Sequence, residues 1–374
     1  MGKHLVLVGG GHAHLTCLKN LRDFVDRGHR VTLISLSPYH YYSGMGPGML
    51  SGIYRPEQIR FNVRKMAEAA GGVFVAGAVV RINPEKRILL LQSGEEMGYE
   101  VVSFNTGSFI PVEKIDIENQ DKIFTVKPIE KLLDAQQKIR ELIQNRKPRL
   151  LIVGGGPAGL EITGNTWRLV NDRRRQAQIT LLAGNKLLSR FPEKARCLAL
   201  ESLQARGVEV IEGVHLSRLE TEQAILTDGR RIAYDFAFLA LGVKPSPLFL
   251  DSGLPAGPEG GLLVNDYLQS IAYPDIFGGG DCINLVSRPL DKVGVYAVRQ
   301  NPILFHNLMA ALEGRNLQPF DPGGDYLLIF NLGNGRAIFC RKNLILDGRL
   351  AFYLKDYIDR KFMRKYQVSG ELEE

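Results

Sequence analysis

Two stretches decide the fold of this chain: His4–Leu18, HLVLVGGGHAHLTCL, and Leu150–Ile162, LLIVGGGPAGLEI. Each is a short apolar run that ends in three glycines and passes into a helix-like segment, which is the pattern of a strand, a tight turn and a helix. Glycine suits the turn because the backbone must approach a pyrophosphate closely, and the following helix offers free N–H groups to that anion. One copy is weak evidence, but two copies predict two dinucleotide-binding βαβ units.

Length and composition describe an ordinary globular protein. The chain has 374 residues, of which 45% are hydrophobic and 23% charged, enough for two or three domains with a large core. The net charge of +7 permits contact with anionic cofactors, an anionic membrane face or nucleic acid without choosing among them. We expect no nucleic-acid binding, and we interpret the largest basic cluster, Arg173–Arg175, as a solvated loop.

The four cysteines, Cys17, Cys197, Cys282 and Cys340, show no metal-ligand or redox spacing. We therefore expect no metal site and a reducing, cytoplasmic environment. The sequence contains no apolar run of the length of a signal peptide or a spanning helix, so any membrane contact is expected at the inner surface of the cell membrane.

The first fingerprint departs from the usual pattern in two ways. We expect a strand over residues 4–9, a helix over 12–25 and a second strand over 30–36. Ser35 stands where an acidic residue at the end of the second strand normally binds ribose, and His14 replaces the third glycine. His12 or His14 could donate a hydrogen bond to a cofactor phosphate; the alternative is that both make only structural contacts.

Residues 39–54, YHYYSGMGPGMLSGIY, combine aromatic residues with glycine and proline. This composition predicts a long loop beside an extended cofactor, or alternatively a surface loop with an aromatic plug. Further strands are expected at residues 72–82, 87–91, 100–106, 207–211 and 236–241.

The second fingerprint is complete, with Gly154, Gly156 and Gly159, and follows a predicted helix over residues 128–145. Its second strand, residues 178–183, again ends without an acid, at Ala183. The nearby Lys186 could favour a 2′-phosphate, although a lone loop lysine is usually only solvated.

The last third of the chain carries three signals. Residues 274–282, PDIFGGGDC, put Asp281 after an apolar run and before a predicted helix over 295–312, at the edge of a sheet where ligands bind. A hairpin is expected over 326–341. Residues 350–366 predict an amphipathic helix that either lies on a membrane or packs on its own domain; the apolar positions of its face are Leu350, Leu354, Tyr357, Ile358 and Met363.

These motifs, VGGGHAH, NTGS, VGGGPAGLE, ALG and IFGGGD, follow one another over about residues 4–312, and the chain resembles the two-dinucleotide-binding-domain flavoproteins of the pyridine nucleotide-disulfide oxidoreductase superfamily. Within it the chain looks most like the type II NADH dehydrogenase branch. More narrowly, GGGHAH, YSGMGPGMLSG, GVYAVRQNPILFHNL and KDYIDRKFM are similar to the flavoprotein domain fused in some bacteria to selenide, water dikinase.

The resemblance implies an α/β fold with two Rossmann-like domains, the second inserted in the first, and a small α+β tail. The implied boundaries are 1–112 with 246–320 for FAD, 113–245 for NADH or NADPH, and 321–374 for the tail. Glu161 would lie near the nicotinamide, while Tyr296 and Gln300 would border the electron acceptor. The implied cofactor-binding residues are Gly9, Gly10, Gly11, His12, Ala13, His14, Ser35, Ser43, Gly44, Val79, Thr106, Gly107, Gly154, Gly156, Pro157, Ala158, Gly242, Gly280 and Asp281.

Several departures narrow the expected activity. The chain lacks a cysteine pair for disulfide reduction and the cysteines of sulfide:quinone oxidoreductases beside the second fingerprint, and residues 297–300 match the quinone motif only loosely. We expect an FAD-dependent oxidoreductase that passes a hydride from NAD(P)H to FAD and electrons to a small-molecule acceptor, with quinone as one candidate. The alternative is a flavin-binding accessory protein of a selenium or sulfur pathway with a degenerate nicotinamide site. A homodimer and a membrane contact through residues 350–366 are further expectations.

Overall fold

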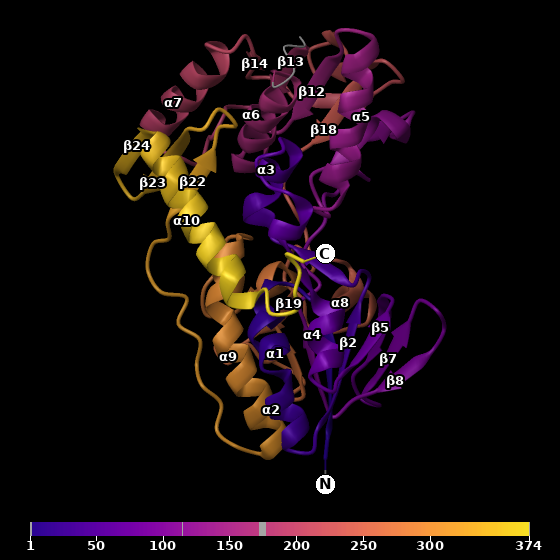
Figure 1. Cartoon of the computed structure of the whole chain (residues 1–374). Coiled ribbons are helices and arrows are strands. Elements are labelled where there is room, and N and C mark those ends of the chain that lie inside the picture. The colour runs from indigo at the N-terminus through magenta and orange to yellow at the C-terminus, as the bar shows by residue number, and fades with distance from the viewer. Residues whose placement is uncertain (1, 114, 172–176, 374) are drawn as a thin grey trace.

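Two five-stranded parallel sheets form the centres of the two lobes of the molecule (Figure 1). The computed structural model describes residues 2–113, 115–171 and 177–373, so Arg173–Arg175 lie outside the described residues. In the first sheet the strand before the first glycine turn lies in the middle. The order is β5 (Val73–Ala76), β2 (Arg30–Ser35), β1 (His4–Val8), β9 (Val101–Phe104) and β20 (Ile276–Gly278).

The second sheet repeats this arrangement around the second glycine turn. Its order is β14 (Glu209–Ile211), β13 (Gln178–Leu182), β12 (Arg149–Val153), β18 (Phe236–Leu239) and β11 (Ile123–Thr125). The apolar runs of β1 and β12 are buried, as expected for central parallel strands flanked on both faces. The predicted α/β class with two Rossmann-like sheets is confirmed, while the domain boundaries stay a prediction because strand pairing does not fix where a domain ends.

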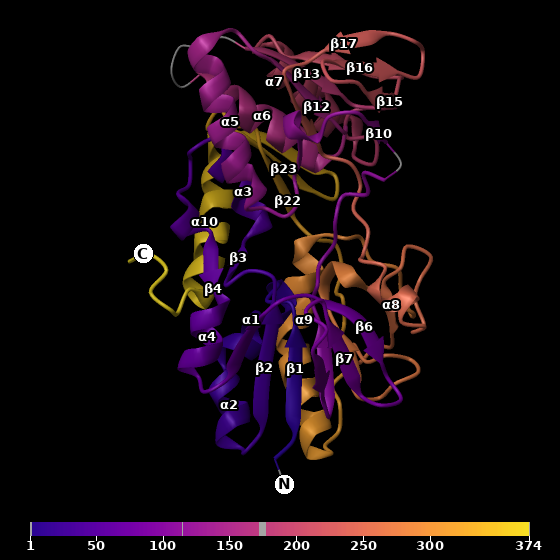
Figure 2. The same cartoon turned by 90° about the vertical axis from the view of Figure 1, so that its right-hand side faces the viewer.

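Helices and small antiparallel sheets flank the two parallel sheets (Figure 2). The helix expected over 12–25 is broken into three pieces, η1 (His12–His14), α1 (Leu15–Lys19) and α2 (Leu21–Asp26). Other helices, apart from those of residues 39–54 and of the C-terminal tail described below, are η3 (Pro56–Gln58), α4 (Val63–Ala69), η4 (Gln120–Lys122), α5 (Lys131–Asn145), α6 (Pro157–Asn171), α7 (Glu193–Gln204), α8 (Leu248–Asp251), η5 (Gly280–Cys282) and α9 (Gly294–Glu313). The antiparallel strands are β6 (Val79–Asn83), β7 (Ile88–Leu91), β8 (Glu96–Gly98), β15 (Leu216–Leu219), β16 (Gln223–Leu226) and β17 (Arg231–Ala233); β10 (Asp116–Ile117) pairs β15 in parallel, as β19 (Leu262–Val264) pairs β21 (Ile283–Leu285).

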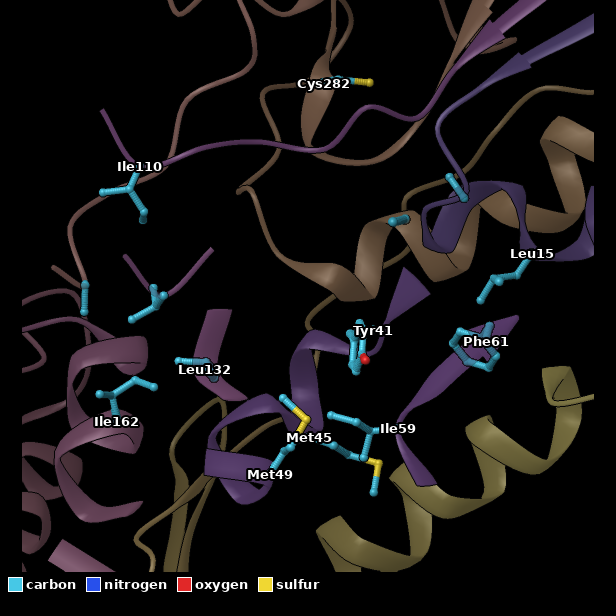
Figure 3. Packing of buried hydrophobic residues seen from close by; sticks show 14 of the residues in the cluster. Leu15, Tyr41, Met45, Met49, Ile59, Phe61, Ile110, Leu132, Ile162 and Cys282 are labelled. Carbon is cyan, nitrogen blue, oxygen red and sulfur yellow. The ribbon is translucent and has the colours of Figure 1, made fainter. Parts of the chain in front are cut away.

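The expectation of a long loop over 39–54 is wrong. This segment forms β3 (Tyr39–Tyr41), which pairs with β4 (Arg60–Asn62), then η2 (Ser43–Met45) and α3 (Gly46–Leu50). Its methionines are buried and lie near Leu132 of α5 and Ile162 of α6 (Figure 3). The glycines, which suggested a loop, instead permit close packing, since a Cβ on Gly46 would lie 2.9 Å from the Ile129 side chain. The strand expected over 72–82 is likewise two strands, β5 and β6, in different sheets.

The C-terminal tail forms a three-stranded sheet followed by a long helix. Its elements are β22 (Leu328–Asn331), β23 (Ala337–Arg341), β24 (Leu344–Gly348) and α10 (Arg349–Tyr366). The predicted hairpin and helix are thereby confirmed, with β24 as an addition. In Figure 1, α10 runs from the upper lobe down to the lower one, so the tail spans both lobes.

Candidate cofactor and electron-transfer site

Hydrogen bonds of the Asn105 side chain hold the first glycine turn in place. Asn105 follows β9, its side chain accepts a hydrogen bond from the Ala13 backbone N–H at 3.0 Å, and it donates to the Gly279 carbonyl at 2.6 Å. A Cβ on Gly11 would lie 2.2 Å from the Asn105 side chain, and Gly9 has a φ of +90°. The turn after β1 and the segment after β20 are therefore held against one asparagine, which the sequence analysis noted only as part of NTGS.

The contacts of His14 favour the second of its two expected roles, in which the ring makes only structural contacts. The His14 side chain is fully buried, with Nδ1 2.7 Å from the Gly9 carbonyl oxygen and Nε2 2.8 Å from the Ser103 hydroxyl. Burial lowers the pKa of His14 to about 4, so the ring is neutral at physiological pH. Both ring nitrogens are used inside the fold, and the ring fills the space that a third glycine would leave.

His12 behaves differently because one ring nitrogen has no protein partner. Its Nδ1 lies 3.1 Å from Nε2 of His40, while its Nε2 is buried and has no hydrogen-bond partner among the described residues. Burial and, next, the charge of Lys127 lower the pKa of His12 to about 4. A buried ring nitrogen without a partner beside a glycine turn fits a cofactor atom that would complete its hydrogen bonding.

Asp281 lies at the end of the first sheet in a small polar cluster. Its Oδ2 accepts hydrogen bonds from the Ser108 hydroxyl at 2.6 Å and the Lys127 ammonium group at 2.8 Å. Burial alone would raise the pKa of Asp281, but Lys127 and Ser108 hold it below its usual range. The carboxylate is thus ionised and ready to accept further hydrogen bonds.

Tyr296 and Gln300 lie on α9, the helix that follows Asp281 in the chain, and line one pocket with Gly280 and Asp281. Gln300 is almost completely buried, and its Oε1 accepts a hydrogen bond from the Gly280 N–H at 2.7 Å. Its carboxamide therefore fixes the turn that carries Asp281. Tyr296 is more exposed than Gln300, with 9% of its surface accessible to solvent.

The second glycine turn depends on three close backbone approaches. A Cβ on Gly154 would lie 2.2 Å from the Ala240 carbonyl oxygen, and one on Gly155 would lie 2.3 Å from that of Ala183. A Cβ on Gly159 would lie only 1.8 Å from the Gly154 oxygen. Gly156 has no neighbour within 4 Å of such a Cβ, so the turn is open to a ligand there, with Pro157 and Ala158 beginning α6.

The other predicted cofactor residues lie at or after strand ends, or in the segment that follows β3. Ser35 ends β2, Val79 begins β6, and Gly10 lies against Val63. The rest lie after strands or in the 42–46 segment: Ser43, Gly44, Thr106, Gly107 and Gly242. Lys186 forms an ion pair with Glu193 at 3.0 Å, which favours its interpretation as a surface lysine.

Glu161 lies near the start of α6, beside charged residues of α10 that the sequence did not indicate as neighbours. Its Oε1 accepts a hydrogen bond from the Asn331 backbone N–H at 2.8 Å. Lys355 of α10 donates to Asp359 at 2.7 Å and to the Gly44 carbonyl at 2.8 Å, and its positive charge acts on Glu161. Burial raises the pKa of Glu161 to about 7, against the opposing effects of Lys355 and Asn331.

The described residues contain neither a disulfide bond nor a cluster of metal-ligating side chains. All four cysteines are free, and Cys17, Cys282 and Cys340 are buried. In the part of the chain that the structure describes, no group of three or more His, Cys, Asp or Glu side chains could hold a metal ion. Within the same residues no helix has the length and apolar character to cross a bilayer.

Comparisons with known proteins agree with this geometry. Ferroptosis suppressor protein 1 of Xenopus laevis is 24% identical over 341 residues, 87% of this chain and 85% of that protein. Type II NADH:quinone oxidoreductase of Haemophilus influenzae is 24% identical over 423 residues, 98% of this chain and 94% of that protein. The second similarity supports the type II NADH dehydrogenase branch; the link to a selenide, water dikinase fusion stays a prediction.

Solved structures share the whole fold. NDH2 from Plasmodium falciparum in complex with NADH matches with a TM-score of 0.83 at 13% identity, over 99% of this chain and 98% of that one. Sulfide:quinone oxidoreductase from Aquifex aeolicus matches with a TM-score of 0.80 at 19% identity, over 98% and 92%. The family model for pyridine nucleotide-disulphide oxidoreductases matches residues 3–307. This chain therefore belongs to the pyridine nucleotide-disulphide oxidoreductase family, whose members work with FAD and a pyridine nucleotide.

Proposed function

We propose that this oxidoreductase transfers a hydride from NADH or NADPH to FAD and passes the electrons to a small-molecule acceptor of the quinone class. The observation that carries the proposal is the position of Glu161, which lies beside the second glycine turn and next to the Lys355–Asp359 pair of α10. FAD, when bound, supplies the two-electron redox chemistry, and the protein supplies binding, orientation and protons.

A quinone takes up protons as well as electrons, so its site needs a group that holds a proton near neutral pH. Glu161 suits this role because its pKa is raised to about 7. Its Oε1 is bonded to the Asn331 N–H, which leaves Oε2 to hold the proton. Lys355, fixed by Asp359 and by the Gly44 carbonyl, can stabilise the carboxylate after the proton has left.

An anaerobic titration of the purified protein with NADH and then NADPH, followed by the visible absorption of the flavin, tests the donor half. Bleaching by either nucleotide is the expected result. Adding a water-soluble quinone without oxygen should then restore the absorption in the wild type, and more slowly in Glu161→Gln. Glu193→Gln, on the exposed side chain of α7, is the matched control and should behave like the wild type.

The second candidate is a flavin-binding accessory protein of a selenium or sulfur pathway. The absence of an acid at the end of β13, where Ala183 stands, favours it because the ribose of a pyridine nucleotide bound at the second glycine turn lacks its usual partner. A protein that retains its flavin but is bleached by neither nucleotide would support this candidate and contradict the first.

We also propose that α10 lies on an anionic membrane surface. The helix buries a charged pair, Lys355 and Asp359, while several of its apolar side chains are exposed, which is the reverse of the usual pattern for a helix exposed to water. The side chains of Lys355 and Asp359 are 12% and 6% exposed, whereas Leu350, Tyr353 and Tyr357 are 85%, 63% and 58% exposed. Met363, which was expected on the same face, is instead buried.

The neighbouring strand β24 adds to this apolar surface, since Leu344 and Leu346 are each 54% exposed. Exposed basic residues follow along the helix at Lys361, Arg364 and Lys365, which suits anionic lipid headgroups.

Co-sedimentation with vesicles of anionic and of neutral lipids tests the contact. The wild type should bind anionic vesicles, and the double variant Leu350→Glu/Tyr357→Glu should not. Val286→Glu, at a position 56% exposed outside the tail, is the control. If the double variant instead changes only the mass in size-exclusion chromatography, the apolar face joins two copies of the chain and the membrane proposal is wrong.

A further inference from the structure

A lysine from the second half of the fold reaches into the cluster around Asp281. Lys127 follows β11, an edge strand of the second sheet, whereas Asp281 follows β20 of the first sheet. The Lys127 ammonium nitrogen lies 2.8 Å from Asp281 Oδ2 and 2.8 Å from the Ser108 hydroxyl oxygen. The Thr125 hydroxyl donates to the Lys127 carbonyl at 2.6 Å, which fixes the backbone at the base of this side chain.

The charge of Lys127 also acts on the first glycine turn. It is one of the causes that lower the pKa values of His12 and His40, after burial in both cases. Lys127 therefore contacts Asp281 and carries a charge that acts on His12, and these two residues come from the two segments that Asn105 holds together. An extended cofactor that runs from the first turn to Asp281 would end beside this ammonium group.

A diphosphate at the first glycine turn would find little positive charge in the turn itself or in the helical segments that follow it. The segment that follows it is divided into pieces of three, five and six residues, so no long helix directs its dipole at the turn. Residues 9–14 contain no lysine or arginine, and both histidines are neutral. Lys292, the other lysine that acts on Asp281, donates to the Ile283 carbonyl instead.

We propose that Lys127 is an FAD-binding residue contributed by the second domain, and that its ammonium group serves the cofactor's diphosphate as well as Asp281. The diphosphate and the Asp281 carboxylate bring several negative charges into one partly buried site, and such a site requires a positive partner. Because this partner belongs to the other lobe, FAD also fastens the two lobes to each other. The proposal rests on FAD use by the family and not on the electron acceptor.

Equilibrium dialysis of the purified full-length protein against graded FAD measures the effect. Lys127→Met should weaken FAD binding on the order of 10- to 100-fold, because a hydrogen bond to a charged group contributes about 1.5–3 kcal/mol. Lys127→Arg should lose only a few-fold. Lys122→Met is the matched control, since Lys122 lies on the same segment with the same side-chain exposure of 26% but pairs with the exposed Glu222.

Riboflavin, which has the flavin ring and ribityl chain but no diphosphate, separates a diphosphate contact from a purely structural role. Lys127→Met should weaken FAD binding much more than riboflavin binding, and added salt should reduce the difference. Lys127→Gln gives the same comparison if the methionine variant does not fold. An equal loss of FAD and riboflavin binding, or FAD binding within two-fold of that of Lys122→Met, would overturn the proposal whatever the outcome of the NADH and quinone experiments.

Discussion

Replacing Glu161 by glutamine should stabilise the protein in alkaline solution and leave its stability unchanged in acid. Burial raises the pKa of Glu161 from an ordinary 4.5 to about 7. The difference, 7 − 4.5, corresponds to about 3 kcal/mol at most, because each pKa unit is worth about 1.4 kcal/mol. Glutamine keeps the acceptor oxygen that the Asn331 N–H needs, so the substitution removes the charge and preserves the hydrogen bond.

The sign of this effect follows from proton binding. Between pH 4.5 and 7 the folded protein holds a proton on Glu161 that the unfolded chain has released, so the contribution of this residue to stability falls as the pH rises through that window. The glutamine variant has no such proton. The difference in the free energy of unfolding, variant minus wild type, should therefore be near zero below pH 4.5, grow through the window and stay constant above pH 7.

Urea unfolding of both proteins at a series of pH values measures this difference, in which the titrations of all other groups cancel. Glu193→Gln is a control of opposite sign, because hydrogen bonds from Lys186 and then Arg196 lower the pKa of Glu193. That variant should lose stability at neutral pH and recover it in acid. The reasoning about Glu161 is refuted if its glutamine variant is less stable than the wild type at neutral pH and recovers in acid, since Glu161 would then be an ionised partner of Lys355 with a lowered pKa.

Two further substitutions test the framework of the site. Asn105→Ala leaves the Ala13 N–H and the Gly279 carbonyl without their buried partner, so we expect a loss of about 2–4 kcal/mol and a faster release of FAD, measured by thermal unfolding and flavin fluorescence. Gly164→Ala puts a Cβ 2.4 Å from the Leu332 carbonyl oxygen and should push β22 away from α6. We expect a lower unfolding temperature and, because Glu161 becomes less buried, a pKa of Glu161 nearer 4.5. An unchanged pH dependence of the free energy of unfolding would contradict this prediction.

The parts of the fold that the sequence predicted are those set by local patterns. The runs before Gly9 and Gly154 are apolar and bounded by glycines that the backbone requires, so strand, turn and helix could be located from neighbouring residues alone. The hairpin over 326–341 followed from its Gly-Asn-Gly turn in the same way. Asp281 was predicted to lie at a ligand-binding edge because it follows a short apolar run that ends in glycines.

The parts that the sequence did not predict depend on partners far along the chain. Lys127 and Asp281 are 154 residues apart, and no local pattern distinguishes this lysine from a solvated one. His14 was ambiguous for the same reason, because its role depends on Ser103 in another strand. In residues 39–54, glycine indicated a long loop, whereas in the fold Gly46 permits contact with the Ile129 side chain and Gly48 permits contact with the ring of Tyr54.

The C-terminal tail contributes the residues that surround Glu161, the group on which the proposed acceptor chemistry depends. The family match ends at residue 307, yet Asn331, Lys355 and Asp359, which surround Glu161, all lie beyond it. The same helix that carries Lys355 and Asp359 inward carries Leu350 and Tyr357 outward. A water-exposed helix gains nothing from that orientation, whereas a helix on a lipid surface buries its apolar side chains and keeps its charged pair beside the redox site. The proposed proton-holding role of Glu161 and the proposed membrane contact therefore depend on the same orientation of α10, and an acceptor dissolved in the membrane would meet both.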